Sequence, residues 1–305
     1  MKIEFLHRDE IDDALWDACI NKALNSLIYG YSWYLDEVCD DWDALVYDDY
    51  KAVMPLPHRR KWGFTYCYQP FFCQQLGVFS TTETGEALLK AFFSALPAHY
   101  TLFDMQLNVF SKPLDGLGKL RTRTNYRLPL IPVYEKIASG YNNNTKRNIK
   151  KAEANKIAAF ENADPFSVIA LYKRHYADKT PEINDAAYDR LTRLVSKAIK
   201  MGAVQAWGVY DEHNTLCGGA IFLTDHKNLY YLLGGADDAG RYNGGLHTLF
   251  DALIKRYAGL DLVLDFEGSD IEGIARFYAG LGAKPLSYYH LRINRLPWWL
   301  KLFKK

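Results

Sequence analysis

Two carboxylates two positions apart could do acid–base chemistry in this sequence. Asp265 and Glu267 lie in the run Asp-Phe-Glu-Gly-Ser, directly after an almost continuously apolar stretch at residues 262–264. Residues two apart on a strand point to one face, and the carboxyl end of a strand faces the ligand crevice in open α/β sheets. One carboxylate could therefore act as a general base or position an amine nucleophile. The alternative is a strand-end turn hinged at Gly268, in which Asp265 accepts from backbone N–H groups; we favour it for Asp265 and keep both interpretations for Glu267.

A second group of residues could bind an anion. Residues 240–246 read Gly-Arg-Tyr-Asn-Gly-Gly-Leu and precede a helical pattern. Glycines at a helix N-terminus let backbone N–H groups approach an anion, which the helix dipole also favours. Arg241 adds a charge, and Asn243, Gly244 and Gly245 complete the turn, so we expect a pyrophosphate or carboxylate here. A flexible glycine turn without a ligand is the alternative.

A third group is a basic helix predicted at residues 146–156. Lys146, Arg147, Lys150 and Lys151 follow one another at positions i, i+1, i+4 and i+5, which concentrates positive charge on adjoining faces. This spacing suits a diphosphate or another polyanion. The alternative is an ordinary solvated helix face.

The elements that must position these residues alternate between strand and helix patterns. Apolar periodicity and turn residues predict an α/β protein whose two halves have similar orders of elements, which suggests a structural duplication. We predict helices at residues 11–23, 85–96, 166–175, 185–201, 246–257 and 271–281, strands at 44–47, 52–56, 102–109, 126–133, 204–210, 216–224, 229–233, 262–266 and 287–293, and a loop at 234–245.

Length and composition restrict the class of protein. The chain has 305 residues, 49% of them hydrophobic and 24% charged, with a formal net charge of +1; this suits about two soluble domains rather than a disordered or bulk nucleic-acid-binding chain. The five cysteines are odd in number and none are spaced C-x-x-C, which favours reduced thiols over zinc or disulfides. No metal site is expected, since the histidines show no ligand spacing.

The two ends of the chain bear on location. The N-terminus lacks the apolar segment of a signal peptide, and no stretch approaches the length of a membrane span, so we expect a cytoplasmic protein. Residues 295–305 interleave Trp, Leu and Phe with Lys and Arg. Such a tail can lie in a membrane interface, giving peripheral contact at the inner face of the membrane; a tail folded back on the core is the favoured alternative.

Three motifs, taken together, resemble a known family. The order strand, hairpin, Arg-x-x-Gly-Gly (241–245), helix and strand is similar to the GNAT acyltransferase fold, with Leu246 where the family has Gly or Ala. Residues 265–269, followed by Phe277-Tyr278-x-x-Leu281-Gly282, resemble the D-F-x-G…F-Y-x-x-F-G signature of FemABX-type peptidyltransferases. Residues 147–152, Arg-Asn-Ile-Lys-Lys-Ala, resemble that family's R-x-x-I-K-K-A helix, with one residue in place of two between Arg and Ile. The matches cover residues 125–293.

The resemblance implies a fold and an activity. FemABX proteins are tandem-GNAT enzymes that add amino acids to peptidoglycan precursors, so we expect two GNAT-like domains with mixed sheets flanked by helices, at residues 1–134 and 135–305, and a basic connecting helix near 142–157. The expected reaction transfers an acyl or aminoacyl group to an amine, on an anionic or muropeptide-like acceptor.

The same resemblance suggests roles for residues. Glu267, Tyr278 and Asp265 are the candidate catalytic residues, and Ser269 and Arg276 would join the basic helix in binding substrate. No cofactor is expected to be bound permanently; acyl-CoA or aminoacyl-tRNA would be the donor substrate. No long coiled-coil hairpin of the kind that some members use for tRNA is evident, and no stable nucleic-acid complex is expected. The alternatives are an acyl-CoA N-acyltransferase acting on a small metabolite and a non-catalytic tandem GNAT protein that binds an anionic ligand.

Overall fold

Two compact units make up the chain. In the computed structural model, residues 2–111, 116–268 and 270–297 are described. Unit 1 comprises Met1–Arg123 with Ser287–Lys305, and unit 2 comprises Thr124–Leu286. This division describes compact units of the structure; the domain boundary that the sequence suggests, at residues 134–135, stays a prediction.

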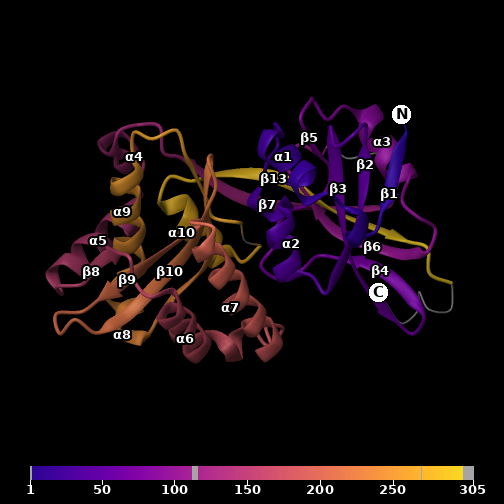
Figure 1. Ribbon diagram of the computed structural model, residues 1–305. Coiled ribbons are helices and arrows are strands. Elements are labelled where there is room, and N and C mark those ends of the chain that lie inside the picture. Colours follow the sequence, from indigo (N-terminus) through magenta and orange to yellow (C-terminus); the bar gives the residue numbers. More distant parts are fainter. Residues whose placement is uncertain (1, 112–115, 269, 298–305) are drawn as a thin grey trace. The chain divides into compact units, whose positions relative to one another are not determined.

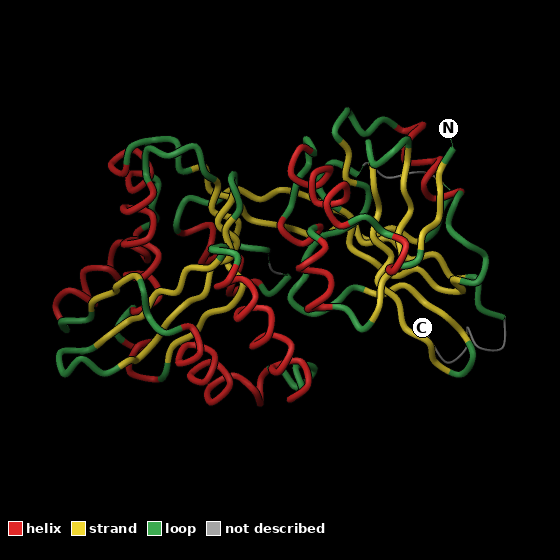
Figure 2. Tube along the Cα trace, in the orientation of Figure 1, coloured by secondary structure: helices red, strands yellow, loops and turns green. Residues whose placement is uncertain are grey.

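Unit 1 is built on a mixed sheet with helices packed on it (Figures 1 and 2). All its neighbouring strands pair antiparallel except β4 and β6, which are parallel. The strand order is β1 (Ile3–Leu6), β2 (Asp41–Tyr47), β3 (Ala52–Lys61), β4 (Phe64–Tyr68), β6 (Tyr100–Leu107), β13 (Lys284–Asn294), with β5 (Phe79–Ser80) paired to β3. The helices are α1 (Asp13–Lys22), α2 (Ser32–Val38) and α3 (Glu86–Ser94).

Local sequence explains how α1 begins and where it packs. The side chain of Asp12 caps the helix by accepting from the N–H groups of Ala14 and Leu15 at 2.9 and 3.1 Å. Trp16 is fully buried, with its ring 5.0 Å from that of Trp42 on β2. The helix is therefore fixed on the sheet by large apolar surfaces.

The strands of unit 2 also pair in a mixed pattern. Its strand order is β7 (Lys119–Pro129), β12 (Val263–Asp265), β11 (Asn228–Ala236), β10 (Leu216–Thr224), β9 (Val204–Tyr210) and β8 (Ala158–Glu161). Among the described residues of this unit, β11 and β12 pair in parallel and the other neighbouring strands antiparallel. The helices are α4 (Tyr134–Ser139), α5 (Asn143–Ala154), α6 (Pro165–Tyr176), α7 (Asp185–Lys200), α8 (Asp238–Tyr242), α9 (Gly245–Tyr257) and α10 (Glu272–Gly280).

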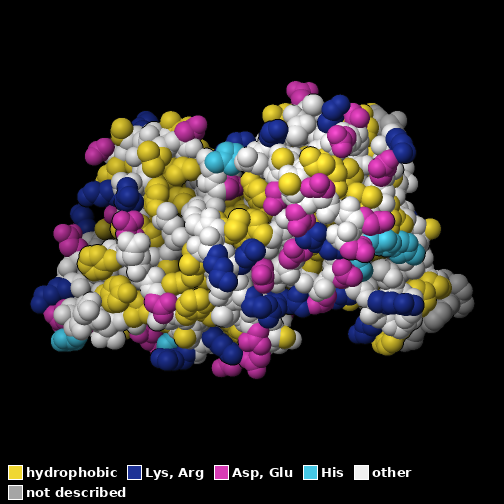
Figure 3. Space-filling model, viewed as in Figure 1, with side chains coloured by type: hydrophobic (Ala, Val, Ile, Leu, Met, Phe, Trp, Pro, Cys, Tyr) yellow, Lys and Arg dark blue, Asp and Glu magenta, His cyan; other side chains and the backbone are white. Residues whose placement is uncertain are grey.

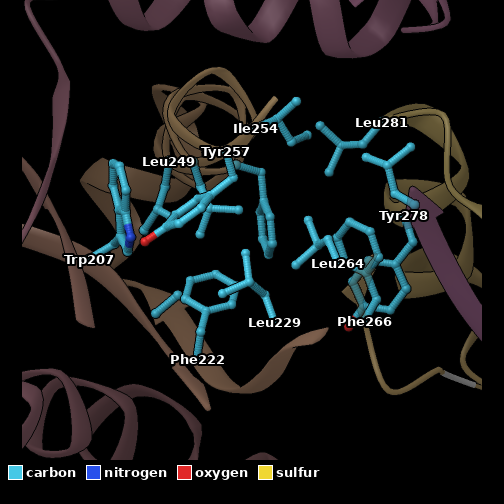
Figure 4. Packing of buried hydrophobic residues seen from close by; sticks show 14 of the residues in the cluster. Trp207, Phe222, Leu229, Leu249, Ile254, Tyr257, Leu264, Phe266, Tyr278 and Leu281 are labelled. Atoms are coloured by element: carbon cyan, nitrogen blue, oxygen red, sulfur yellow. The ribbon is translucent and has the colours of Figure 1, made fainter. Parts of the chain in front are cut away.

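Helices cover both faces of the strands of unit 2. Phe222 of β10 packs edge-on against Phe250 of α9, with ring centroids 5.8 Å apart. Gly219, three residues earlier and therefore on the opposite face, lies against Val168 of α6. In Figure 4 the side chains of the α9 face, from the sheet and from α9 and α10, converge on one buried hydrophobic cluster.

The sequence predictions of mixed α/β architecture and of most elements are confirmed, including the strands at 204–210 and 216–224. The loop predicted at residues 234–245 is wrong. Strand β11 continues to Ala236, and α8 follows because the Asp237 side chain caps it through the N–H of Gly240 at 2.7 Å.

Candidate functional site

Strand β11 loses its parallel neighbour where β12 stops. The two strands pair over only three positions, from Asn228 opposite Val263 to Tyr230 opposite Asp265. Strand β11 then runs six residues further than its neighbour. Backbone N–H and C=O groups along such an edge seek partners, so this opening can receive an extended ligand.

A β-bulge lies at the same place. Ile221 of β10 pairs with Leu233, whereas the next residue, Phe222, pairs with Tyr231, which leaves Leu232 as the extra residue of β11. Bulges bend a strand and are common next to active sites. Here the bulge begins one residue after Tyr230, the last residue of β11 that pairs with β12. The hydrogen-bond ladder between β10 and β11 is therefore irregular where β12 ends.

Asp265 is the buried anchor of the turn that follows β12. It is 3% exposed; its Oδ1 accepts from the N–H of Glu267 at 2.9 Å, and its Oδ2 from Asn125 Nδ2 at 3.1 Å, with Arg127 Nε at 3.3 Å. Burial raises the pKa of Asp265, and the charge of Arg127 opposes that rise. These contacts support the turn-holding role that we favoured for this residue.

The geometry of Glu267 differs from the sequence prediction. We expected Asp265 and Glu267 to share one face of a strand, but β12 ends at Asp265. Glu267 lies beyond it with φ +61°, in the left-handed region, followed by Gly268 at φ +80°. A Cβ on Gly268 would lie 2.2 Å from the carbonyl oxygen of Thr124, so close backbone approach as well as φ requires glycine here.

Tyr278 lies beside Phe266 in the buried hydrophobic cluster (Figure 4). It is 6% exposed, and the centroid of its ring lies 4.6 Å from that of Phe266, with the two rings tilted. Burial, and secondly the charge of Glu267, raise the pKa of Tyr278 well above its ordinary value. The phenol therefore stays protonated near neutral pH and can donate a hydrogen bond.

Three further tyrosines, which the sequence did not single out, share this neighbourhood. Tyr172 and Tyr176 of α6 stack with ring centroids 4.9 Å apart, and Tyr231 of β11 lies 6.3 Å from Tyr278. Burial raises the pKa of Tyr231, and Tyr278, Tyr172, Tyr176 and Glu267 contribute in the same direction. The spacing i, i+4 of Tyr172 and Tyr176 on a predicted helix was the one available signal.

Arg241 is held by neighbouring groups of the protein. It lies on α8, where Nη1 donates to the carbonyl oxygen of Ala236 at 2.8 Å and approaches the hydroxyl of Tyr176 at 3.4 Å, and Nη2 pairs with Asp238. Tyr176 also bonds both backbone groups of Ala236. Arg241 therefore fixes the end of β11, whatever else it binds.

The glycine turn and the basic helix meet. Gly244 caps α9 with φ +77°, and a Cβ there would lie 2.5 Å from the carbonyl oxygen of Asn148 on α5. Lys151 of α5 donates to the carbonyl oxygen of Tyr242 at 2.6 Å. Asn243 ends α8, and Gly245 is the first residue of α9. Two separate sequence motifs thus form one surface.

The remaining cations of α5 are exposed beside this turn. Lys146, Arg147 and Lys150 face solvent, and Arg147 donates to Asn144 Oδ1 at 2.8 Å. The side chain of Asn142 caps α5 by accepting from the N–H of Thr145 at 2.8 Å. The N–H of Asn142 in turn donates to the carbonyl oxygen of Gly280 at 3.0 Å, which ties α5 to α10.

The remaining predicted features are Arg276, Ser269 and the C-terminal tail. Arg276 is exposed on α10, 3.9 Å from Glu272. Ser269 lies outside the described residues, as does the tail from residue 298 onward. Of that tail, Arg295 Nη1 donates to the carbonyl oxygens of Leu96 and Pro97 at 3.3 Å.

His247 is a half-buried residue that the sequence did not indicate. It lies in the first turn of α9, two residues after Gly245, with its ring edge-on to Phe277 at 4.8 Å. Burial lowers the pKa of His247 to about 4, so the imidazole is neutral near pH 7. It could therefore exchange hydrogen bonds with a ligand at the start of α9 without adding charge.

Two kinds of feature are not found in the described part of the chain. No group of three or more His, Cys, Asp or Glu side chains there could hold a metal ion. Among the same residues, none of the helices combines the length and apolar character that crossing a membrane requires.

The fold is that of a tandem GNAT-like α/β protein. The match to the crystal structure of FemX covers 99% of this chain and 99% of the FemX chain, with a TM-score of 0.67 at 11% sequence identity. A conserved protein of unknown function from Bacteroides thetaiotaomicron VPI-5482 covers 96% and 100%, with a TM-score of 0.61 at 11% identity. L-PGS from Bacillus licheniformis covers 96% and 94%, with a TM-score of 0.53 at 10% identity.

Comparison at the level of sequence gives no match. No protein-family model matches the chain, and no curated protein matches it either. At identities of 10–11% the structural likeness shows the fold, which confirms the FemABX-like tandem GNAT architecture that the motifs implied.

Proposed function

We propose that this protein transfers an acyl or aminoacyl group from an activated donor to an amine acceptor. One observation carries the proposal: β12 ends after three paired residues, and this opens the edge of β11 directly beside Glu267 and Tyr278. A carbonyl bound along that edge would meet backbone N–H groups, a carboxylate and a protonated phenol together. The FemX fold and the motifs that resemble FemABX proteins support the same reaction class.

The donor would be held by the surface that the glycine turn and α5 form. Lys146, Arg147 and Lys150 supply exposed positive charge, and the N-terminus of α9 supplies N–H groups and the positive end of a dipole. Such a surface suits a polyanionic carrier, either the diphosphate of an acyl-CoA or the phosphates of an aminoacyl-tRNA.

The chemistry requires no covalent enzyme intermediate. The acceptor amine attacks the donor carbonyl carbon, and the new C–N bond replaces the C–S or C–O bond to the carrier. Backbone N–H groups at the β11 edge stabilise the developing oxyanion. Glu267 takes the amine proton, which passes to the leaving thiolate or alkoxide, and Tyr278 donates a hydrogen bond that stabilises the leaving atom. Placing donor and acceptor together supplies much of the acceleration.

Residue roles divide accordingly. Glu267 and Tyr278 are the proposed catalytic residues. Asp265, with Arg127 and Asn125 bonded or paired to it, is a positioning residue that fixes the Glu267 turn. Ser269 and Arg276 remain candidates for binding the acceptor, which we propose to be anionic and muropeptide-like.

A non-catalytic alternative has one observation in its favour. The carbonyl oxygen of Asn148 occupies the space beside Gly244, and Arg241 is engaged by Ala236 and Asp238, so both motif residues have structural roles. Mass spectrometry of mixtures of the protein, an acyl-CoA or aminoacyl-tRNA donor and an amine acceptor separates the two. A covalent product of the acyl or aminoacyl group and the acceptor supports transfer. Saturable binding without product supports the alternative.

A further inference from the structure

The β3–β4 hairpin of unit 1 presents a tryptophan to solvent. Lys61 pairs with Phe64, so Trp62 and Gly63 form a two-residue turn with φ values of +52° and +81°. Positive φ at both positions defines a type I′ turn, for which Asn-Gly and Gly-Gly are the favoured sequences. A bulky residue in this conformation is an outlier, and here its side chain is 76% exposed. The fold thus bears local strain to hold an indole ring in water, an observation that points to function.

Positively charged side chains flank the turn. Lys61 Nζ lies 4.9 Å from the Trp62 ring centroid, and the Arg59 guanidinium lies 4.2 Å from the ring of Tyr68. Arg60 and Lys61 are both exposed, and within the described residues neither has a carboxylate partner. In Figure 3, Lys and Arg side chains and hydrophobic ones lie together at the lower right, where Figure 1 places β4.

The acidic residues near the hairpin are engaged by neighbouring side chains. Asp40 pairs with Arg59, and Asp41 Oδ2 lies 3.4 Å from His58 Nε2. Asp43 is 5% exposed; its Oδ1 lies 3.1 Å from His7 Nδ1, and its Oδ2 accepts from the hydroxyl of Tyr100. Arg59 thus balances Asp40, and the exposed charges of the hairpin tip itself, those of Arg60 and Lys61, are positive.

The last described residues approach the same edge of unit 1. The N–H of Arg295 donates to the carbonyl oxygen of Thr101 at 2.7 Å, and the Thr101 hydroxyl donates to the carbonyl oxygen of Thr65 on β4 at 3.1 Å. The sequence beyond Pro297 is Trp-Trp-Leu-Lys-Leu-Phe-Lys-Lys. Arg295 is therefore linked through Thr101 to β4, the second strand of the hairpin. The sequence that follows is a second stretch of tryptophan, aliphatic residues and lysine.

We infer that this edge of unit 1 docks on an anionic membrane surface, with Trp62 in the headgroup region and Arg60 and Lys61 against lipid phosphates. Tryptophan prefers the membrane–water interface, and each Lys or Arg near an anionic bilayer adds attraction. Single-stranded nucleic acid is the less suitable partner, because it is bound through several stacked aromatic faces along a basic groove, whereas the turn offers one ring. This inference does not depend on the proposed transfer reaction.

Vesicle flotation with the full chain tests the inference. Phosphatidylcholine vesicles with phosphatidylglycerol should carry the protein upward, those without it should not, and high salt should weaken binding. Trp62→Gly is the decisive variant: glycine adopts φ +52° without strain, so the variant should fold at least as stably while binding the vesicles at least fivefold more weakly. Arg60→Gln with Lys61→Gln should weaken binding roughly 25-fold.

Matched controls complete the experiment. Phe110→Ala removes another half-exposed aromatic ring of unit 1, and Lys119→Gln with Arg121→Gln removes two other exposed charges; both should bind as the parent does. Unchanged binding by the Trp62 and Arg60/Lys61 variants overturns the inference, as does binding lost only in Trp298→Ala with Trp299→Ala. Binding to single-stranded RNA that requires Trp62, without binding to anionic vesicles, overturns it in favour of nucleic acid.

Discussion

The backbone N–H of Glu267 donates a 2.9 Å hydrogen bond to Oδ1 of Asp265. The two carboxylates of the motif therefore do different things: one is buried and holds the backbone of the other. Because Glu267 sits at φ +61°, a conformation that non-glycine residues rarely adopt, the turn depends on this bond and on the contacts of Asp265 with Asn125 and Arg127.

Replacing Asp265 with Asn should destabilise the protein. The amide cannot accept from Asn125, Arg127 and the Glu267 N–H as the carboxylate does, so one buried polar group loses its partner. We expect the free energy of unfolding to fall by about 1–3 kcal/mol, measured by urea denaturation. An unchanged value would show that Asp265 does not hold the turn; Glu272→Gln, an exposed carboxylate on α10, is the control.

Much of the fold could be predicted because its elements carry their own signals. Apolar periodicity marks α7 and α9, alternation and turn residues mark β9 and β10, and the Asn142 side chain caps α5 as its position suggests. Helix α8 escaped prediction because five residues carry no periodicity, and its stability comes from the Asp237 cap.

The site could be predicted only in part. Glu267, Tyr278, the glycine turn and the basic helix were each recognisable as short motifs, but their contacts arise from tertiary packing. Tyr172 and Tyr231 approach Tyr278 from different elements, and no local spacing encodes that meeting. The left-handed backbone conformation of Glu267 could not be predicted either, because it is held by the buried contacts of Asp265 and is not one that glutamate prefers.

Gly244→Ala should lower stability by more than its backbone conformation alone requires. Alanine in the left-handed region costs about 1–2 kcal/mol, and the added Cβ at 2.5 Å from the Asn148 carbonyl oxygen forces α5 to shift, at a further cost of about 1–3 kcal/mol. Gly202→Ala is the control, since Gly202 has φ +65° and a Cβ added there would meet nothing within 4 Å. Equal losses in the two variants would mean that α5 does not pack on the turn.

The basic helix should set the salt dependence of donor binding. Changing Lys146, Arg147 and Lys150 to Gln should weaken the binding of coenzyme A or tRNA and flatten its dependence on salt, because exposed charges act over about 10 Å at 0.1 M salt. Calorimetric titrations at several salt concentrations measure both. Lys197→Gln with Lys200→Gln, on α7, is the charge control. If the salt dependence of donor binding is unchanged in the α5 variant, the charges of α5 do not contact the donor.

His7 should make the stability of unit 1 depend on pH. Its hydrogen bond to the buried Asp43 raises the pKa of His7 above the ordinary 6.5. A raised pKa means that the bond stabilises the fold fully below pH 6.5 and that this contribution disappears as pH rises through the folded-state pKa. In His7→Gln the urea midpoint should therefore fall more at pH 6 than at pH 9; an equal fall at both values would contradict the assignment.

The most direct test of the proposed transfer is the rate of product formation by Glu267→Gln, followed by mass spectrometry beside its melting temperature. The glutamine keeps the shape of the side chain and removes the base, so product formation should fall about 10²-fold or more while the melting temperature stays that of the parent. Tyr278→Phe should behave similarly, because the ring still packs on Phe266. A parent protein that forms no product from any acyl-CoA or aminoacyl-tRNA donor, or a Glu267→Gln variant that melts earlier but keeps its rate per folded molecule, would contradict the account.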